Sequence, residues 1–117
     1  GLIAASEAII LGEKFGIDPN TINEVLNVSS GKNNSTENKI CQFILTEKFS
    51  SGFSLALMSK DIMIANKLAK KLNIKPIGIN FSTKIWADAN NHYTKNSDHT
   101  EIFKYLKKIS TKKNPKK

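Results

Sequence analysis

The residues that could carry chemistry in this 117-residue chain are few: one cysteine, two histidines and a Lys60–Asp61 pair. Cys41 lies among apolar neighbours with no activating partner in view, which predicts a buried and unreactive thiol. His92 and His99 have no cysteine or carboxylate set at ligand spacing, so we expect no metal site. Taken alone, the Lys60–Asp61 pair is typical of a solvated charge pair on a helix. Any specific chemistry must therefore come from longer motifs.

The formal net charge of +8 raises the question of nucleic-acid or membrane partners. All 18 basic residues are lysines, and arginine, which suits bidentate phosphate and base contacts, is absent. Half of the net charge lies in the basic tail 111–117, which we expect to be disordered. No apolar run reaches the roughly 20 residues of a membrane span. We therefore expect neither partner, and the single cysteine indicates a reducing compartment, the cytoplasm or the mitochondrial matrix.

Helical periodicity accounts for the first part of the chain. A first helix is predicted over 2–15, with Gly16 as its C-cap. A second is predicted to begin at Asp18–Pro19, an N-cap followed by proline, and to run to Asn27. The residues expected on the apolar stripe of the first helix are Ile3, Ala4, Ala8, Leu11 and Phe15.

Four more helices are predicted in the remainder, over 37–45, 55–72, 77–90 and 99–109. Asp98 is the expected N-cap of the last one. In the helices over 55–72 and 77–90, the residues expected to face the core are Leu57, Met58, Ile62, Ala65, Leu68, Ala69, Leu72, Ile77, Phe81, Ile85 and Ala89. Helices joined by short turns predict an all-α fold, a single helical-bundle domain of five to six or more helices over 1–110 with no sheet.

One long motif is specific. The segment 52–65 reads Gly-Phe-Ser-Leu-Ala-Leu-Met-Ser-Lys-Asp-Ile-Met-Ile-Ala. It resembles the Gly-Phe-x-Leu-x-x-x-x-Lys-Asp-Leu-x-x-Ala signature in the C-terminal domain of the 3-hydroxyisobutyrate dehydrogenase family. The stretches 16–19 and 27–31, and Pro76, also fall where the family has similar residues. The resemblance runs from about Leu2 to Leu106.

The resemblance implies roles for three residues. Lys60 matches the lysine that in this family reaches the nicotinamide cofactor, NAD or NADP. Asp61 matches the aspartate beside that lysine, and Phe53 matches an aromatic that closes over the substrate. An ammonium near ribose or phosphate oxygens adds charge-assisted hydrogen bonds, and an aromatic lid excludes water from hydride transfer. The substrate implied is a small β-hydroxyacid or its semialdehyde.

Departures from the family limit this interpretation. The chain has no Gly-x-Gly-x-x-Gly loop and no strand–helix alternation, so it has no means of holding the dinucleotide pyrophosphate. The resemblance places the catalytic lysine just upstream of Gly1, so no catalytic residue is expected in this fragment. We expect it to be inactive alone, with its own N-terminal Rossmann domain as a partner and a homo-oligomer as the assembly. The turn 91–97 also lacks the glycines expected before the last helix.

Two other interpretations compete with the dehydrogenase one. The first is a non-enzymatic, basic helical module that binds nucleic acid or an acidic surface, with the lysine tail supplying affinity through counterion release. The second is a stand-alone oligomerisation domain without activity. The absence of arginine and the concentration of charge at one end disfavour the first.

Overall fold

The computed structural model describes residues 1–111, in which seven helical segments follow one another along the chain. They are α1 (Leu2–Phe15), α2 (Pro19–Asn27), η1 (Ser35–Ile44), α3 (Leu55–Lys71), α4 (Ile77–His92), η2 (His99–Glu101) and α5 (Ile102–Ser110). Within 1–111 the only extended pairing is an isolated bridge between Ser54 and Asp98, so the all-α prediction is confirmed. None of the described helices is long and apolar enough to cross a membrane. All but the first residue of the predicted tail 111–117 lies outside the described residues.

The helices form two compact units. Unit 1 comprises residues 1–50 and 100–117, and unit 2 comprises residues 51–99. Unit 1 therefore contains α1, α2, η1 and α5, whereas unit 2 consists of α3, α4 and the segments that flank them.

The first two helices of unit 1 begin and end as their sequence predicts. Gly16 ends α1 in a left-handed conformation, with φ of 102°, which glycine adopts without steric cost. The Asp18 carboxylate then accepts a hydrogen bond of 3.0 Å from the Thr21 amide and caps α2. Gly12 lets the two helices approach closely, because a Cβ at this position would collide with the side chain of Ile22.

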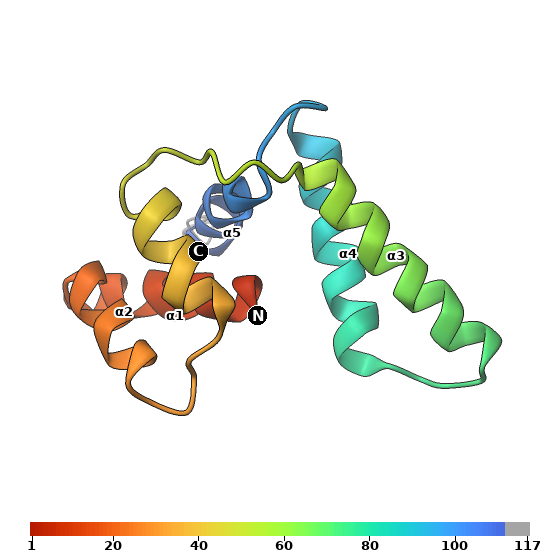
Figure 1. Ribbon diagram of the computed structural model, residues 1–117, viewed down its shortest axis with the longest axis horizontal. Helices are drawn as coiled ribbons and strands as arrows, with labels where there is room; N and C mark the ends of the chain where they lie inside the picture. The colour runs from red at the N-terminus through yellow and green to blue at the C-terminus, as the bar shows by residue number, and fades with distance from the viewer. Residues whose placement is uncertain (112–117) are drawn as a thin grey trace, which may run out of the picture. The chain divides into compact units, whose positions relative to one another are not determined.

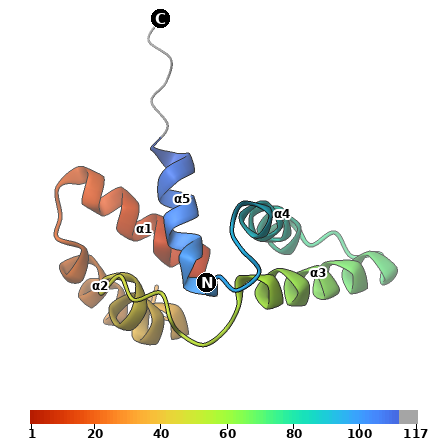
Figure 2. The ribbon, with the colours of Figure 1, turned by 90° about the horizontal axis from the view of Figure 1, so that it is seen from above.

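The core of unit 1 lies where α1 packs against α5, α2 and η1 (Figure 2). Its most buried apolar side chains are Leu2, Ala5, Ile9, Ile10, Ile40, Ile44, Ile102, Phe103 and Leu106. The predicted apolar stripe of α1 was therefore misplaced, because Leu11 and Phe15 are exposed. The helix is apolar around most of its circumference, so periodicity alone could not decide which side meets α5.

The third predicted helix forms with a different hydrogen-bond pattern. Residues Ser35–Ile44 make a π-helix, in which amides bond to carbonyls five residues earlier, and the Leu45 amide continues this pattern with a 2.9 Å bond to the Ile40 carbonyl. Its buried side is formed by Thr36, Ile40 and Ile44. Cys41 lies on the other side and is exposed, so the prediction of a buried thiol was wrong.

Unit 2 is a hairpin of two antiparallel helices, α3 and α4 (Figure 1). The Ser54 hydroxyl caps α3 by accepting a 3.1 Å hydrogen bond from the Leu57 amide. After α3, Asn73 takes a left-handed conformation with φ of 56°, and Pro76 then precedes α4 as its N-cap. The buried apolar side chains of unit 2 are Leu55, Ala69, Trp86 and Ala89.

The hairpin leaves much of its apolar surface exposed. Several residues that the sequence assigned to the core are exposed in the structure, namely Leu57, Ala65, Leu68, Leu72, Ile77 and Phe81. The physical reason is the width of the apolar faces. Two helices cover only a narrow seam of each other, and here that seam is made largely of small or polar residues such as Ser59, Asn66, Ala69 and Ala89.

The predicted last helix also starts differently. It opens as the short 3-10 turn His99–Glu101, and the α-helix proper begins at Ile102. Asp98 directly precedes the 3-10 turn, where the sequence predicted the helix to start, whereas the residue that precedes α5 itself is Glu101. The Asp98 carboxylate accepts hydrogen bonds from Ser51 and Gly52, 46 residues or more away in the sequence.

Candidate functional site

An open hollow of about 470 Å³ lies beside the N-terminal end of α3, within unit 2. The segment before α3 supplies Gly52, Phe53 and Ser54, the first turn of α3 supplies Ala56 and Leu57, and the turn after α4 supplies Lys95, Asn96 and Asp98. The Gly-Phe half of the predicted motif thus lines a concave surface of a size suited to a small ligand.

Phe53 is half-buried at this hollow. The preceding Gly52 has φ of 89°, a conformation that side chains strongly disfavour, so a glycine here allows the chain to turn into Phe53. The Phe53 and His99 rings stand nearly perpendicular to each other, with centroids 5.5 Å apart and an interplanar angle of 84°. This edge-to-face contact is a favourable geometry for two aromatic rings and fixes one side of Phe53.

Asp98 and its neighbours form a buried cluster under the Phe53 loop. The Ser51 hydroxyl lies 2.9 Å and 3.1 Å from the two carboxylate oxygens of Asp98, and the Gly52 amide donates a 3.0 Å bond to the same carboxylate. The Leu55 amide donates a 2.8 Å bond to the Ser97 carbonyl. The chain entering α3 is thereby tied to the chain leaving α4.

His99 completes this cluster. Its backbone amide and its ring Nδ1 lie 2.8 Å and 3.1 Å from the carbonyl oxygen of Phe53, and Nδ1 is also 3.0 Å from the Ser51 hydroxyl. Because a carbonyl oxygen only accepts, we assign the hydrogen to Nδ1, which leaves Ser51 free to direct its own hydrogen to Asp98. The Ser51 hydroxyl, the Asp98 carboxylate and His99 Nδ1 then each have a hydrogen-bond partner within the cluster.

The Ser51, Asp98 and His99 side chains do not have the arrangement of a hydrolytic triad. In a triad the imidazole stands between serine and aspartate and uses a different nitrogen for each. Here Ser51 contacts both the carboxylate and the imidazole, and the same Nδ1 faces a backbone carbonyl. The cluster therefore holds the backbone and does not activate Ser51 as a nucleophile.

Lys60 and Asp61 lie on α3, exposed and one turn beyond the hollow. Lys60 is three residues after Leu57 and four after Ala56, a spacing that puts it on the same helix face as these two lining residues, with Cβ separations of roughly 5–6 Å. Within residues 1–111 neither Lys60 nor Asp61 forms an ion pair or a side-chain hydrogen bond. The structure thus places Phe53 at the hollow and Lys60 one turn beyond the lining residue Leu57 along α3.

This chemistry fits one part of a nicotinamide dinucleotide. The Lys60 ammonium is free to donate to ribose or phosphate oxygens, and Phe53 with Leu57 offers an apolar wall beside it. Asp98 also lines the hollow, but its carboxylate already accepts hydrogen bonds from Ser51 and Gly52. Residues 1–111 contain no group of three histidine, cysteine or acidic side chains that could hold a metal ion.

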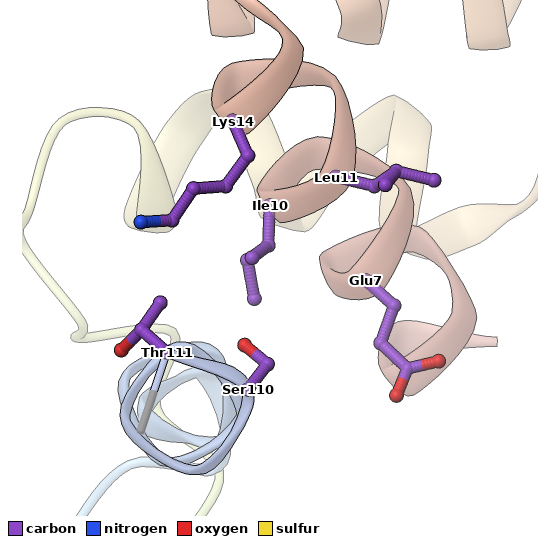
Figure 3. Close-up of a pocket in the computed structure, with 6 residues that line it drawn as sticks. All are labelled: Glu7, Ile10, Leu11, Lys14, Ser110 and Thr111. Atoms are coloured by element: carbon purple, nitrogen blue, oxygen red, sulfur yellow. The ribbon is translucent and has the colours of Figure 1, made fainter. Parts of the chain in front are cut away.

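A second hollow, of about 500 Å³, lies in unit 1 between α1 and the end of α5 (Figure 3). Ile10 and Lys14 project from α1 toward Ser110 and Thr111, while the Leu11 side chain points away from them and Glu7 lies one turn before it (Figure 3). Its charged groups are one acid and one base on a helix surface, and none of its residues belongs to the motif at 52–65. We therefore place the candidate site in unit 2.

The motif residues could be recognised in the sequence, but the cluster that supports them could not. Asp98 was interpreted as a helix cap, and His99 only as a residue without metal partners. The contacts of both residues are with positions 46 to 48 residues earlier in the chain, beyond the reach of periodicity and capping rules. A carboxylate and an imidazole side by side before an apolar helix were the one available signal.

The all-α fold and the Phe53–Lys60 motif define a helical domain of the dehydrogenase type. Residues 1–106 match the family described as NAD-binding of NADP-dependent 3-hydroxyisobutyrate dehydrogenase, and the chain belongs to this family. The family match supports NAD or NADP as the cofactor of the intact enzymes that carry this domain.

Three curated relatives are dehydrogenases. The chain is 34% identical over 73 residues to 2-(hydroxymethyl)glutarate dehydrogenase of Eubacterium barkeri, covering 62% of this chain and 24% of that protein. It is 27% identical to a probable mitochondrial 3-hydroxyisobutyrate dehydrogenase of Arabidopsis thaliana, over 90% of this chain and 32% of that protein. It is 25% identical to the mitochondrial 3-hydroxyisobutyrate dehydrogenase of Rattus norvegicus, over 94% and 35%. The chain thus spans between a quarter and about a third of the length of these relatives.

Proposed function

We propose that this chain is the C-terminal domain of an NAD(P)-dependent dehydrogenase that transfers a hydride between the cofactor and a short β-hydroxyacid or its semialdehyde. The observation that carries the proposal is that Phe53 lines the hollow at the start of α3, while Lys60 lies one helical turn beyond the lining residue Leu57. The membership of the chain in a dehydrogenase family supports it. In this proposal a Rossmann domain and a catalytic lysine are supplied by sequence outside this chain, and the chain alone is inactive.

Each site residue then has a defined task. Lys60 donates hydrogen bonds to the cofactor, and Phe53 covers the substrate and keeps water from the reacting carbon. Asp61 lies four residues after Leu57 on α3, one turn from the hollow, where its carboxylate helps to shape the surface that meets the cofactor. NAD(P), when bound, supplies the hydride chemistry, and the residues of this chain bind, orient and shield.

The proposal is tested by replacing Lys60 in the full-length protein. We expect Lys60→Ala to raise the dissociation constant for NAD(P)H about tenfold, since a charge-assisted hydrogen bond at an accessible site contributes roughly 1.4 kcal/mol. Fluorescence titration of the reduced cofactor measures this constant directly. The control is Lys84→Ala, which removes an exposed lysine of α4 that lines no hollow described above. Equal affinities in Lys60→Ala and the parent protein would contradict the assignment.

We further propose that the intact protein is a homo-oligomer in which the exposed face of unit 2 is covered. On α3 the exposed residues Leu57, Ile64 and Leu68 follow one another at helical spacing, and on α4 Ile77 and Phe81 are 85% and 64% exposed. Together these five residues form what is called here the exposed stripe of unit 2. An apolar surface of this extent on a water-facing hairpin indicates a partner. Two copies of the same stripe can cover each other about a two-fold axis, which is the commonest arrangement in soluble oligomers.

Substituting a charge into this stripe tests the second proposal. We expect Phe81→Glu to raise the self-dissociation constant of the full-length protein by at least about tenfold, because a buried unpaired carboxylate is costly. Sedimentation velocity over a concentration series gives the constant. Ile109→Glu is the matched control, as Ile109 is an exposed apolar residue of unit 1 outside the stripe. A parent protein that stays monomeric throughout the series would show that another part of the same polypeptide covers the face.

A further inference from the structure

We propose that Asp98 and His99 are positioning residues of the site, which act by holding the Gly52–Phe53 segment so that the Phe53 ring stands at the hollow. This inference rests on the proposed function, in which Phe53 covers the substrate. It assigns a role to two residues that lie outside the Gly-Phe to Lys-Asp motif and that would otherwise be interpreted as parts of a turn.

Several contacts from Asp98 and His99 converge on two consecutive residues, Gly52 and Phe53. The Gly52 amide donates to Asp98, and the Phe53 carbonyl accepts from both the amide and the ring of His99. The Phe53 side chain also packs nearly perpendicular to the His99 ring. His99 therefore holds both the backbone and the side chain of Phe53, and Asp98 holds the preceding residue, Gly52.

The burial of Asp98 and His99 also supports this positioning role. Asp98 and His99 are 9% and 5% exposed, and a buried carboxylate or imidazole is costly unless its hydrogen bonds are made. The Asp98 carboxylate accepts from Ser51 and Gly52, and His99 Nδ1 has the Phe53 carbonyl and the Ser51 hydroxyl. A network in which each group is paired is rigid, because any movement of the loop leaves a buried polar group unsatisfied.

The Gly52–Phe53 segment also needs the support that Asp98 and His99 provide. Gly52 is exposed, and a Cβ placed on it would meet no other atom within 4 Å, so packing does not restrain it. Glycine also has the largest conformational freedom of any residue. Without Asp98 and His99, the Phe53 ring would sample several positions, and a misplacement of about 1 Å at a reacting centre costs up to roughly a hundredfold in rate.

A double-mutant cycle between Asp98 and Phe53 in the full-length enzyme tests the inference. We expect Asp98→Ala to lower kcat/KM for the hydroxyacid at least about tenfold while leaving the dissociation constant for NAD(P)H unchanged. Phe53→Ala should lower kcat/KM to a similar extent. The double variant should be no worse than Phe53→Ala, because Asp98 acts through a ring that is no longer present. Losses that multiply in the double variant would overturn the inference.

Two controls separate positioning from folding. Trp86 is the only tryptophan of these 117 residues and is buried in unit 2, so a change in tryptophan emission between a full-length variant and its parent reports a disturbed hairpin. Thr94→Ala, in the same turn as Asp98, removes a hydroxyl whose hydrogen-bond partner is the Ser97 hydroxyl and should leave kcat/KM unchanged. Asp98→Asn keeps an oxygen for the Gly52 amide and offers its Nδ2 to the Ser51 hydroxyl, so it should recover most of the activity. Failure of Asp98→Asn to recover any activity while Trp86 emission is unchanged would count against the proposed network.

Two substitutions test the part played by His99. His99→Asn keeps a side-chain donor near the position of Nδ1 but loses the ring, whereas His99→Phe keeps the ring but loses the donor. We expect His99→Asn to retain more activity, since the Phe53 carbonyl and the Ser51 hydroxyl keep a partner. Full activity in both variants would overturn the role of His99. An inactive parent enzyme would instead refute the proposed function, and a parent that is active while Asp98→Ala is unimpaired would refute only this inference.

Discussion

Units 1 and 2 use apolar residues in opposite ways. In unit 1 the helices α1, η1 and α5 bury Ile9, Ile40 and Leu106 almost completely. In unit 2 most of the large aliphatic side chains of α3 and α4 are exposed, and the seam between the helices is small and polar. The first unit has a core of its own, and the second has an apolar surface available for another partner.

In the proposed assembly, this difference explains why unit 2 would carry the site. A hairpin whose apolar face is covered by a partner places its ends next to that partner. The N-terminal end of α3, with Phe53 and Lys60, is one of those ends, and Leu57 belongs both to the hollow and to the exposed stripe of unit 2. The cluster of Ser51, Asp98 and His99 provides locally, through hydrogen bonds, the rigidity that unit 1 obtains from its core.

The contrast between the buried core of unit 1 and the exposed apolar face of unit 2 is tested most strongly by a matched pair of leucine truncations. Leu106 in unit 1 is 1% exposed and Leu68 in unit 2 is 54% exposed. We expect Leu106→Ala to lower the free energy of unfolding by about 2–5 kcal/mol, because it leaves a cavity in a packed core. Leu68→Ala should change it by less than about 0.5 kcal/mol. Urea titration followed by circular dichroism measures both.

Protein concentration provides the control for this pair. At low concentration, where self-association is weak, the difference between the two variants should be largest. As the concentration rises, a partner that covers the stripe stabilises the folded parent, and the cost of Leu68→Ala should grow. Equal costs for the two substitutions at low concentration would mean that Leu68 is already buried within a single chain, contrary to the contrast between the units.

Most helix boundaries could be predicted from the sequence because they depend on local chemistry. The limits of α1 and α2 agree with the predictions at Leu2, Phe15 and Asn27, and the capping roles of Gly16 and Asp18 are confirmed. Each is set by a backbone conformation or a hydrogen bond within a few residues. The π-helical pattern of Ser35–Ile44 was not predictable in this way, because the residues of η1 would suit an ordinary α-helix as well.

Burial was much harder to predict than helix position. Leu68 of α3 and Phe81 of α4 were assigned to the core because apolar residues at helical spacing usually face the core of a protein. Periodicity identifies an apolar face but not what covers it, and in this chain that face is exposed. Phe53 and Lys60 were found through a motif, whereas Asp98 and His99 could be recognised only from contacts between distant parts of the chain.

The smallest expected effect compares the helix caps of the two units. Asp18 in unit 1 and Ser54 in unit 2 each accept a hydrogen bond from a first-turn amide, at 3.0 Å and 3.1 Å. We expect Asp18→Ala and Ser54→Ala each to lower the free energy of unfolding by about 1 kcal/mol, since loss of a cap leaves one amide unpaired. The decrease in the free energy of unfolding should be the same in both units. A helix cap acts through a local hydrogen bond, so its contribution does not depend on whether the apolar face of the unit is buried. Thr46→Ala, which removes an exposed hydroxyl bonded only to the Gln42 carbonyl, is the control and should have little effect. A cost at Ser54 several times that at Asp18 would show that the start of α3 is held by more than its cap, as the hydrogen bond from Leu55 to Ser97 would allow.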